Sequence, residues 1–383
     1  MKVSSRGMVA PFQVMDILRT ANERVAAGHD VFHLEAGEPG GAVAAPVRRA
    51  AERALAAGRI GYTEPLGLPA LRARIAAYYR ERYALDIPVE RVVVTSGASA
   101  AFILAFSALF DLGQRVALAE PGYPAYRNIL TVLGLVPVVL SSKAATRYQP
   151  TPAMLSEQRA LSGLVLQSPA NPTGAMLTAL ELSALIDAAA RLDLWLVCDE
   201  IYHGITYEAP AETALRFSSD VVVVNSFSKY FAMTGWRIGW MVVPQRLVRP
   251  VELLQQSLFI SPSAISQYAA LGAFEALDDF DARVAGYREN RDILMAALRE
   301  AGVTDIIPPA GAFYLYTDVR RFTNDAEAFC ARMLTETGVA ATPGTDFDPV
   351  GGRSAIRFSF AGTRADIEAA ARRLIPWFRN QPV

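Results

Sequence analysis

The stretch VVVVNSFSKYFAMTGWRIGW, residues 221–240, decides how the rest of the chain is interpreted. Its four consecutive valines lack polar alternation, which is typical of a strand that is covered on both faces of a parallel sheet. Lys229 follows this strand among aromatic residues, a setting that lowers the pKa of an amine and favours the neutral nucleophile. A solvent-facing lysine beside a structural Arg237 is the alternative interpretation.

Similar short apolar runs lie on both sides of this stretch and alternate with helical patterns, among them 100–112 and 180–191. This alternation predicts an α/β fold with a mostly parallel sheet wrapped by helices. The apolar run at 100–110 is too short to span a bilayer and is expected to be a buried helix. The expected strands are 92–95, 115–119, 163–167, 195–199, 221–225 and 238–243.

The two ends of the chain have a different pattern. Residues 12–28 fit an amphipathic helix, and 264–300 fit a helix with a break near Asp278 and Asp279. A smaller α+β unit follows, and it is expected to contain strands 312–316 and 355–360 and helices 326–335 and 364–378. We therefore expect a large domain at 35–270 and a small domain built from 1–34 and 271–383.

Composition points to small molecules as partners. The chain has 383 residues, of which 52% are hydrophobic, and 37 basic against 38 acidic residues give a net charge of -1. Nothing in this balance attracts nucleic acid or an anionic membrane. Two cysteines, Cys198 and Cys330, make no disulfide framework, and the amino terminus lacks an apolar secretion signal, so a cytoplasmic location is expected.

Lysine is scarce, occurring only at positions 2, 143 and 229, whereas the other 34 basic residues are arginine. Lys2 lies at the terminus and Lys143 lies in a polar stretch. Any chemistry that needs a reactive amine is therefore assigned to Lys229.

Ligands of open parallel sheets bind beyond the carboxyl ends of the strands, so the residues that follow each strand belong together as one candidate site. Ser96, Gly97, Ala98 and Ser99 follow the first strand with small residues that open a helix, as a phosphate site requires, although a plain helix cap has the same pattern. Arg237 offers a fork of donors to such a phosphate.

Asn171 and Asp199 follow two further strands. Asn171 lies in SPANPTG at 168–174, which also fits an ordinary turn, and its bond to Pro172 is a candidate cis peptide. Asp199 ends an apolar strand, where a buried carboxylate needs a partner such as a protonated pyridine nitrogen, a helix end or a structural cation. Asn171, Asp199 and Lys229 recur at intervals of about 30 residues, one for each strand and helix unit.

With these residues in view, the chain resembles the class I and II aminotransferases, pyridoxal-5′-phosphate (PLP) enzymes of fold type I in the aspartate aminotransferase superfamily. The resemblance implies the three-layer fold of PLP transferases and covers nearly the whole chain. The motifs that carry it are AGEPG at 36–40, GYTEPLGLPALR at 61–72, VTSGASAA at 94–101, AEPGYPAY at 119–126, SPANPTG at 168–174, CDEIY at 198–202, SFSKYFAMTGWRIGW at 226–240, GAFYLY at 311–316, and TPGTDF with IRFSFA within 342–361.

The resemblance implies roles for individual residues around the PLP ring. Lys229 would carry the cofactor as a Schiff base and move the proton during catalysis, and Asp199 would keep the pyridine nitrogen protonated. Asn171 and Tyr202 would hydrogen-bond the ring 3′-oxygen, and Tyr123 would stack on the ring. An ordinary core or turn aromatic is the alternative interpretation of Tyr123.

The phosphate and the substrate would be held by further residues. Arg357 would grip the substrate α-carboxylate, with Gly37 and Asn171 beside it. Tyr62 of the partner subunit would reach the phosphate, which implies a homodimer with shared sites, although Tyr62 also fits a turn aromatic. The remaining phosphate ligands would be Gly97, Ala98, Ser99, Ser226 and Arg237.

Some features lie outside the expected site. His33 and His203 match no catalytic position of the family and have no metal-ligand spacing, so they are read as structural and no metal is expected. Gly40 and Gly41 replace the aspartate and aromatic residue that commonly follow Gly-Glu-Pro in the family. That departure leaves the size of the substrate open.

The expected function is transfer of the amino group of an L-amino acid to a 2-oxo acid, with glutamate and 2-oxoglutarate as one pair, in amino acid metabolism or biosynthesis. A PLP-dependent carbon–sulfur β-lyase uses the same residues and is the alternative. A PLP-binding transcription regulator is disfavoured because the match begins almost at residue 1 and the chain has no basic surplus. No arginine occurs between 249 and 283, where dicarboxylate-specific relatives often have one, which favours an apolar or aromatic substrate.

Overall fold

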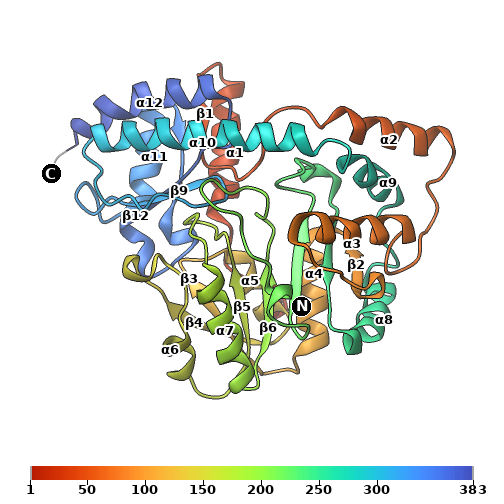
Figure 1. Cartoon of the computed structure of the whole chain (residues 1–383). Coiled ribbons are helices and arrows are strands. Elements are labelled where there is room, and N and C mark those ends of the chain that lie inside the picture. Colours follow the sequence, from red (N-terminus) through yellow and green to blue (C-terminus); the bar gives the residue numbers. More distant parts are fainter. Residues whose placement is uncertain (1, 382–383) are drawn as a thin grey trace.

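The computed structural model describes residues 2–381 and has a seven-stranded sheet at its centre (Figure 1). The order across the sheet is β2 (Val92–Thr95), β8 (Gly239–Val242), β7 (Val222–Ser226), β6 (Trp195–Asp199), β5 (Leu161–Gln167), β3 (Arg115–Glu120) and β4 (Val136–Ser141). Strand β8 is antiparallel to both of its neighbours, β2 and β7, and the other neighbouring strands pair in parallel. This confirms the predicted α/β fold with a mostly parallel sheet.

Helices cover both faces of this sheet and make three layers. One face packs on α4 (Gly97–Leu109), α5 (Pro124–Val132) and α8 (Val248–Leu258) through side chains such as Val93 and Val224. The other face packs on α3 (Pro69–Tyr83) and α7 (Ala179–Arg191) through the alternate side chains, including Val94 and Val223. The short helix α6 (Pro152–Ser156) packs beside α7. The valines of β7 are buried on both sides, as their unbroken apolar pattern predicts.

Most of these strands match the sequence patterns, but several elements have no counterpart in the predictions. The edge strand β4 is not predicted, and its exposed side chains are Val136, Val139 and Ser141. Helices α3, α5, α6 and α8 are also not predicted. The helical region at 264–300 does break, but earlier than expected: α9 (Ala264–Ala273) ends before Asp278 and Asp279, which lie in the first turn of α10 (Leu277–Glu300). Acidic side chains are stabilised in the first turn of a helix, because the amino terminus of the helix carries partial positive charge.

A second, smaller assembly joins the two ends of the chain. A three-stranded antiparallel sheet has the order β11 (Thr342–Pro343), β12 (Ala355–Ser359) and β9 (Tyr314–Asp318). Strand β1 (Phe32–His33) pairs in parallel with β10 (Val339–Ala340). The helices that pack around these strands are α1 (Gln13–Ala26), α10, α11 (Ala326–Thr337) and α12 (Arg364–Arg379), which lie together at the upper left of Figure 1.

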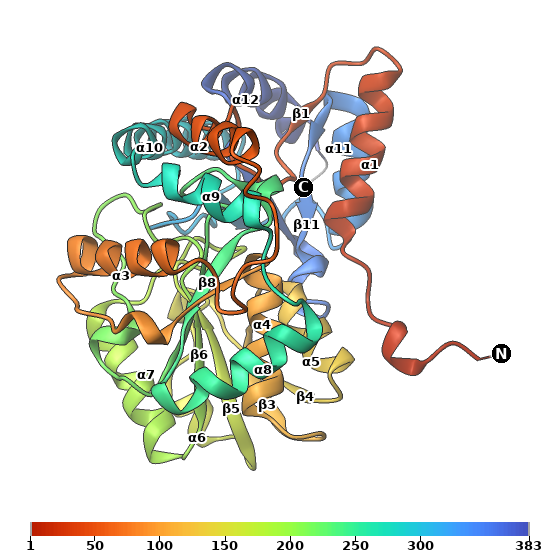
Figure 2. The same cartoon turned by 90° about the vertical axis from the view of Figure 1, so that its right-hand side faces the viewer.

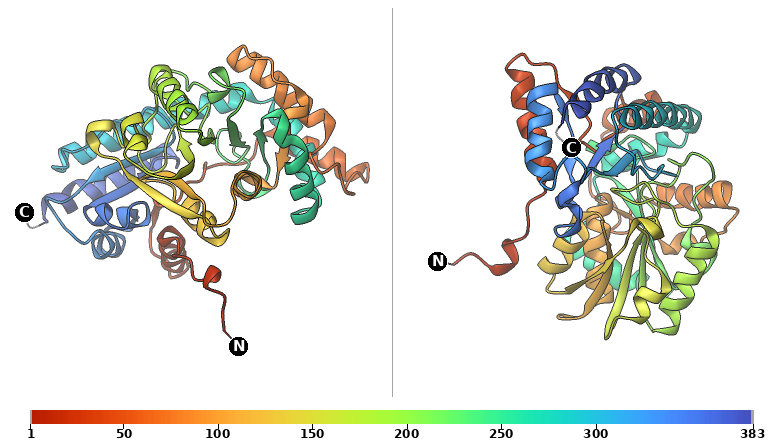
Figure 3. Two further views of the ribbon diagram at one scale, coloured as in Figure 1. Left: turned by 90° about the horizontal axis from the view of Figure 1, so that it is seen from below. Right: turned by 90° about the vertical axis from the view of Figure 1, so that its left-hand side faces the viewer.

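The division into a large domain at 35–270 and a small domain at 1–34 and 271–383 stays a prediction. Helix α9 continues across the predicted boundary at 270/271, and α2 (Ala45–Ala56) packs against it. The segment before α1 extends away from both sheets (Figures 2 and 3). Among the described residues, no helix is long and apolar enough to cross a membrane.

Candidate active site

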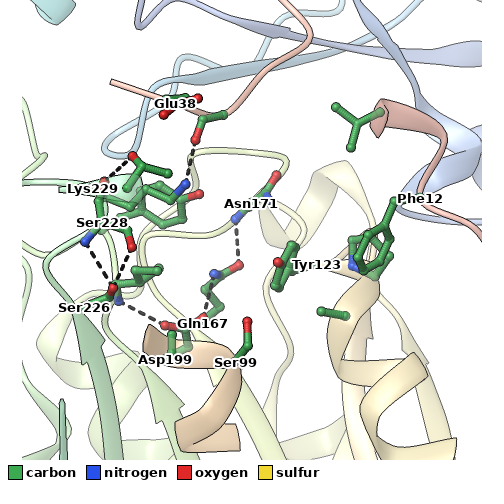
Figure 4. A pocket seen from close by; sticks show the side chains of 18 of the residues that line it. Phe12, Glu38, Ser99, Tyr123, Gln167, Asn171, Asp199, Ser226, Ser228 and Lys229 are labelled. Carbon is green, nitrogen blue, oxygen red and sulfur yellow. Dashed lines mark hydrogen bonds between the residues drawn. The ribbon is translucent and has the colours of Figure 1, made fainter. Parts of the chain in front are cut away.

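A cavity of about 390 Å³ lies where the carboxyl ends of β5, β6 and β7 meet α1 and β12. It brings together almost all of the residues that the sequence singles out, and several of them point toward one another in Figure 4. The predicted residues in its wall are Gly37, Ala98, Ser99, Tyr123, Asn171, Asp199, Tyr202, Ser226, Lys229, Arg237 and Arg357.

Lys229 lies just beyond β7 and projects into the cavity (Figure 4). Its Nζ donates a hydrogen bond to the backbone oxygen of Gly37 at 2.6 Å. Burial lowers the pKa of Lys229 to about 8, helped by the charges of Arg357 and Arg237 and opposed by the acidic groups nearby. A larger share of neutral, nucleophilic amine is therefore present near neutral pH than for an ordinary lysine.

Asp199 ends β6 with its carboxylate buried under the cavity. Oδ2 accepts hydrogen bonds from the Tyr126 hydroxyl and, at 2.9 Å, from Gln167 Nε2, while Oδ1 accepts the backbone N–H of Ile201 at 3.0 Å. Burial raises the pKa of Asp199 to about 6, and these hydrogen bonds limit the rise. The carboxylate is therefore mostly ionised at pH 7, and no basic side chain in residues 2–381 forms an ion pair with it.

Asn171 and Asp199 are linked by Gln167 (Figure 4). The Gln167 side-chain oxygen accepts the backbone N–H of Asn171 at 2.8 Å, and its nitrogen donates to Asp199. The Asn171–Pro172 peptide is cis. This arrangement fixes the loop that follows β5 to the end of β6.

Arg357 enters from β12 and is buried. Nη1 donates to Asn171 Oδ1 at 3.0 Å, and Nη2 donates to Thr342 Oγ1 at 3.2 Å and to the backbone oxygen of Glu35. Its guanidinium carbon lies 4.4 Å from the centre of the Tyr314 ring. Arg357 Nε has no hydrogen-bond partner in the described chain, so this cation retains capacity for an anionic ligand.

Helix α4 begins beside Arg237. Its cap residue, Ser96, makes no side-chain capping bond, and Ala98 and Ser99 line the cavity in the first turn, where N–H groups lack intrahelical acceptors. Gly97 has a φ of +78°, and a Cβ there would lie 2.6 Å from Arg237 Nη2, so glycine is required. The helix terminus, Arg237 and Ser226 together form a cradle suited to a phosphate.

Two aromatic pairs shape the wall. The Tyr202 hydroxyl lies 2.8 Å from that of Tyr314, and a Cβ on Gly37 would lie 1.9 Å from the Tyr314 oxygen, which explains the glycine. Tyr123 packs against Phe12 with ring centres 6.3 Å apart and an interplanar angle of 21°. Tyr123 therefore presents an aromatic surface inside the cavity.

Among the predicted residues, Gly97 adjoins the cavity beside Arg237 without lining it, whereas Tyr62 lies away from it. Tyr62 is 89% exposed and lines a separate surface hollow with Ile60 and residues 261–265. It does not line the cavity that contains the phosphate cradle. The predicted contact of Tyr62 with the phosphate therefore requires a second subunit.

The two histidines that are predicted to be structural lie outside the cavity wall. His203 is buried, with Nε2 3.0 Å from the backbone oxygen of Ser168 and Nδ1 2.8 Å from the Tyr83 hydroxyl. Burial lowers the pKa of His203 to about 3, so it is neutral at pH 7. His33 contacts Glu35 at 2.8 Å.

Several residues of the site have no counterpart in the sequence predictions. Tyr126 and Gln167 hold Asp199, and Tyr314 and Phe347 pack around Arg357. Tyr126 lies within the motif AEPGYPAY and Tyr314 within GAFYLY, but no local signal shows where either side chain points. The cavity wall contributed by the start of α1 is also unpredicted, and it consists of Phe12, Val14, Met15 and Leu18.

Comparison with known proteins identifies the architecture around this site. The family model for class I and II aminotransferases matches residues 29–374. A valine–pyruvate aminotransferase of Mycobacterium tuberculosis is 46% identical over 99% of both chains. The crystal structure of an aminotransferase from M. tuberculosis superposes with a TM-score of 0.97 at 46% identity and covers 100% of both chains. An aspartate aminotransferase of Thermus thermophilus superposes with a TM-score of 0.92 at 32% identity and covers 98% of this chain and 99% of its own.

Proposed function

The chain belongs to the class I and II aminotransferases and transfers amino groups, and we propose that it does so with PLP carried on Lys229. The observation that carries the proposal is the meeting of Lys229, Asp199 and the α4 cradle in one cavity. The relatives are aminotransferases, which favours amino transfer over the carbon–sulfur lyase reaction.

The cavity fits this cofactor at each of its polar groups. A lysine with a pKa of about 8 suits an aldehyde. In residues 2–381 the buried Asp199 carboxylate has no cationic partner, and a protonated pyridine nitrogen would supply one. The start of α4 with Arg237 and Ser226 suits the phosphate. Asn171 Oδ1 is engaged by Arg357, which leaves the Nδ2 donor for the ring oxygen.

When bound, PLP supplies an electron sink for the bonds of the substrate α-carbon. In our proposal, Lys229 Nζ moves the proton at that carbon, and Asp199 holds a proton at the pyridine nitrogen. Tyr202 and Asn171 orient the ring through its oxygen, and Tyr123 covers its face. Gly97, Ala98, Ser99, Ser226 and Arg237 hold the phosphate.

Arg357 binds the substrate α-carboxylate in this proposal, beside Gly37 and Asn171. Its planar fork makes two parallel hydrogen bonds to a carboxylate, which fixes the orientation of the α-carbon. Burial of the guanidinium strengthens that recognition because the surroundings screen charge poorly.

The wall formed by α1 supports an apolar amino donor. Phe12, Val14, Met15 and Leu18 face the cavity, whereas Lys229, Arg237 and Arg357 are the cations that line it in residues 2–381. All three cations already have proposed roles, so a distal substrate carboxylate finds no further cation within the chain. We propose a monocarboxylic donor with an aliphatic or aromatic side chain. The M. tuberculosis relative is named for valine and pyruvate.

The amino acceptor is assigned to one of two 2-oxo acids. Resemblance to the family favours 2-oxoglutarate with glutamate as its product, and the name of the M. tuberculosis relative favours pyruvate.

A panel of donors, including valine, leucine, phenylalanine and aspartate, assayed with each acceptor would identify both the amino donor and the amino acceptor. Preference for aspartate would contradict the apolar donor. Release of ammonia and pyruvate from a single amino acid, with no 2-oxo acid present, would contradict amino transfer.

The homodimer and the cytoplasmic location remain part of the proposal. Tyr62, Ile60 and Ile260 are exposed around the hollow formed by 60–62 and 261–265. Such an exposed apolar surface suits a second copy of the chain, whose phosphate cradle Tyr62 would then reach.

A further inference from the structure

Asp346 is a buried acidic residue in the cavity wall that has no role in the proposed chemistry. It belongs to the short helix η7 (Gly344–Asp346), and it accepts two backbone hydrogen bonds from the first turn of α1. Gln13 N–H donates to Oδ1 at 3.0 Å, and Val14 N–H donates to Oδ2 at 3.3 Å. Asp346 therefore binds the amino terminus of α1, which lies 332 and 333 residues away in sequence.

The Asp346 carboxylate shares the cavity with Arg357. The next residue, Phe347, has its ring centre 4.7 Å from the guanidinium carbon. Burial raises the pKa of Asp346, and the N–H groups of Gln13 and Val14 and the charge of Arg357 oppose that rise. Even so, no carboxylate in residues 2–381 forms an ion pair with Arg357, whose neighbours are the neutral oxygens of Asn171, Thr342 and Glu35.

A buried carboxylate and a buried guanidinium in one cavity attract each other strongly, because little water screens them. If the Asp346 side chain rotated to form an ion pair with Arg357, it would occupy the guanidinium N–H groups that a substrate carboxylate requires. The first turn of α1 offers Asp346 a different partner. The N–H groups of that turn have no acceptors within the helix, and the amino terminus of the helix carries partial positive charge.

We propose that α1, by binding Asp346 through the N–H groups of Gln13 and Val14, keeps Arg357 free for the substrate carboxylate. This inference rests on the proposed role of Arg357. The same helix turn carries Phe12 and Met15 into the cavity, and Figure 4 shows Phe12 beside Tyr123. Docking of α1 thus closes the apolar wall and frees Arg357 in one step, and Asp346 acts as a positioning residue.

Proline at position 13 provides a test with a matched control. Gln13 is the first residue of α1, where proline fits a helix and removes only an N–H group. Phe12 before it already has an extended backbone (φ −85°, ψ 110°), as a residue before proline requires. Gln13→Ala is the control, because both variants lose the side-chain contacts with Glu327 and Thr345 but only proline loses the N–H.

The readout is competitive inhibition by 3-methylbutanoate, a carboxylate that cannot be transaminated, together with KM for the donor. We expect Gln13→Pro to raise both constants about tenfold relative to Gln13→Ala, with kcat and cofactor absorbance less affected. In an Asp346→Asn background, which has no anion to capture Arg357, the same proline should add no further rise.

Two results would overturn the proposal. One is equal inhibition constants for Gln13→Pro and Gln13→Ala. The other is an equally large effect of proline in the Asp346→Asn background, because the change would then come from α1 itself. Failure of the proposed function is seen separately: the wild-type enzyme would transfer no amino group from any donor, or Arg357→Lys would bind 3-methylbutanoate normally.

Discussion

Asn171 and Arg357 are 186 residues apart in sequence, yet Arg357 Nη1 donates a hydrogen bond to Asn171 Oδ1 at 3.0 Å. The contact joins the loop after β5 to strand β12 of the smaller sheet. It orients the Asn171 amide, whose oxygen is engaged and whose nitrogen is left as a donor. The residue proposed for the substrate carboxylate thus also orients a residue proposed for the cofactor.

Replacing Arg357 with lysine should weaken substrate use while the cofactor stays bound. The charge is kept but the planar fork is lost, so kcat/KM should fall by an amount equivalent to about 2–4 kcal/mol. Steady-state kinetics and the absorbance of bound PLP check the two parts. Loss of PLP with unchanged affinity for the amino acid would reverse the assigned roles.

Lys229→Ala should abolish amino transfer and covalent cofactor attachment while leaving the fold intact. Neither Lys2 nor Lys143 lines the cavity, so neither amine can substitute. Borohydride reduction of the wild-type enzyme followed by peptide mapping should place the pyridoxyl group on Lys229. A pyridoxyl group on Lys143 would contradict this assignment.

Reconstitution of the apoenzyme with PLP should speed up as pH rises toward about 8 and then level off. The reactive form of Lys229 is the neutral amine, and burial lowers its pKa from 10.5 to about 8. Below that pH the neutral fraction falls about tenfold for each pH unit. The rate is followed by absorbance over pH 6 to 10, and a midpoint near 10 would show that the amine is unperturbed.

Tyr126→Phe should weaken PLP binding about three- to tenfold at pH 7, because Asp199 loses a hydrogen bond that stabilises its anion. Loss of that donor raises the pKa of Asp199 above its present value of about 6. A carboxylate is ionised above its pKa, so the defect should shrink as pH rises toward 8. Tyr78→Phe, which alters a buried tyrosine outside the cavity wall, is the control for the PLP dissociation constant. Equal losses in both variants would count against a role for Tyr126.

Mixing Lys229→Ala with an inactive Tyr62 variant should restore activity if each site combines residues of two subunits. In a heterodimer, one site then carries both defects and the other is wholly wild type. Random pairing restores about a quarter of wild-type sites. Activity no higher than in the separate controls, with heterodimers shown to be present, would exclude a shared site.

Local sequence patterns predict the α/β fold and the family of this protein. Some features depend only on neighbouring residues, so a short stretch of sequence predicts them. Examples are the unbroken apolar run of β7 and the small residues at the start of α4. Because ligands lie beyond the ends of parallel strands, the positions of Asn171, Asp199 and Lys229 after successive strands are enough to predict that they share one site.

The partners of these residues were decided only by the tertiary structure. Tyr126 and Gln167 on Asp199, Asn171 on Arg357 and α1 on Asp346 are contacts between elements far apart in sequence. Their formation depends on strand order and on how helices pack across the two sheets, and short patterns do not encode these. Sequence alone therefore determined which groups carry the proposed chemistry of the site. The packing of distant elements decided how each group is oriented, how strongly its pKa is shifted and which side chains close the cavity.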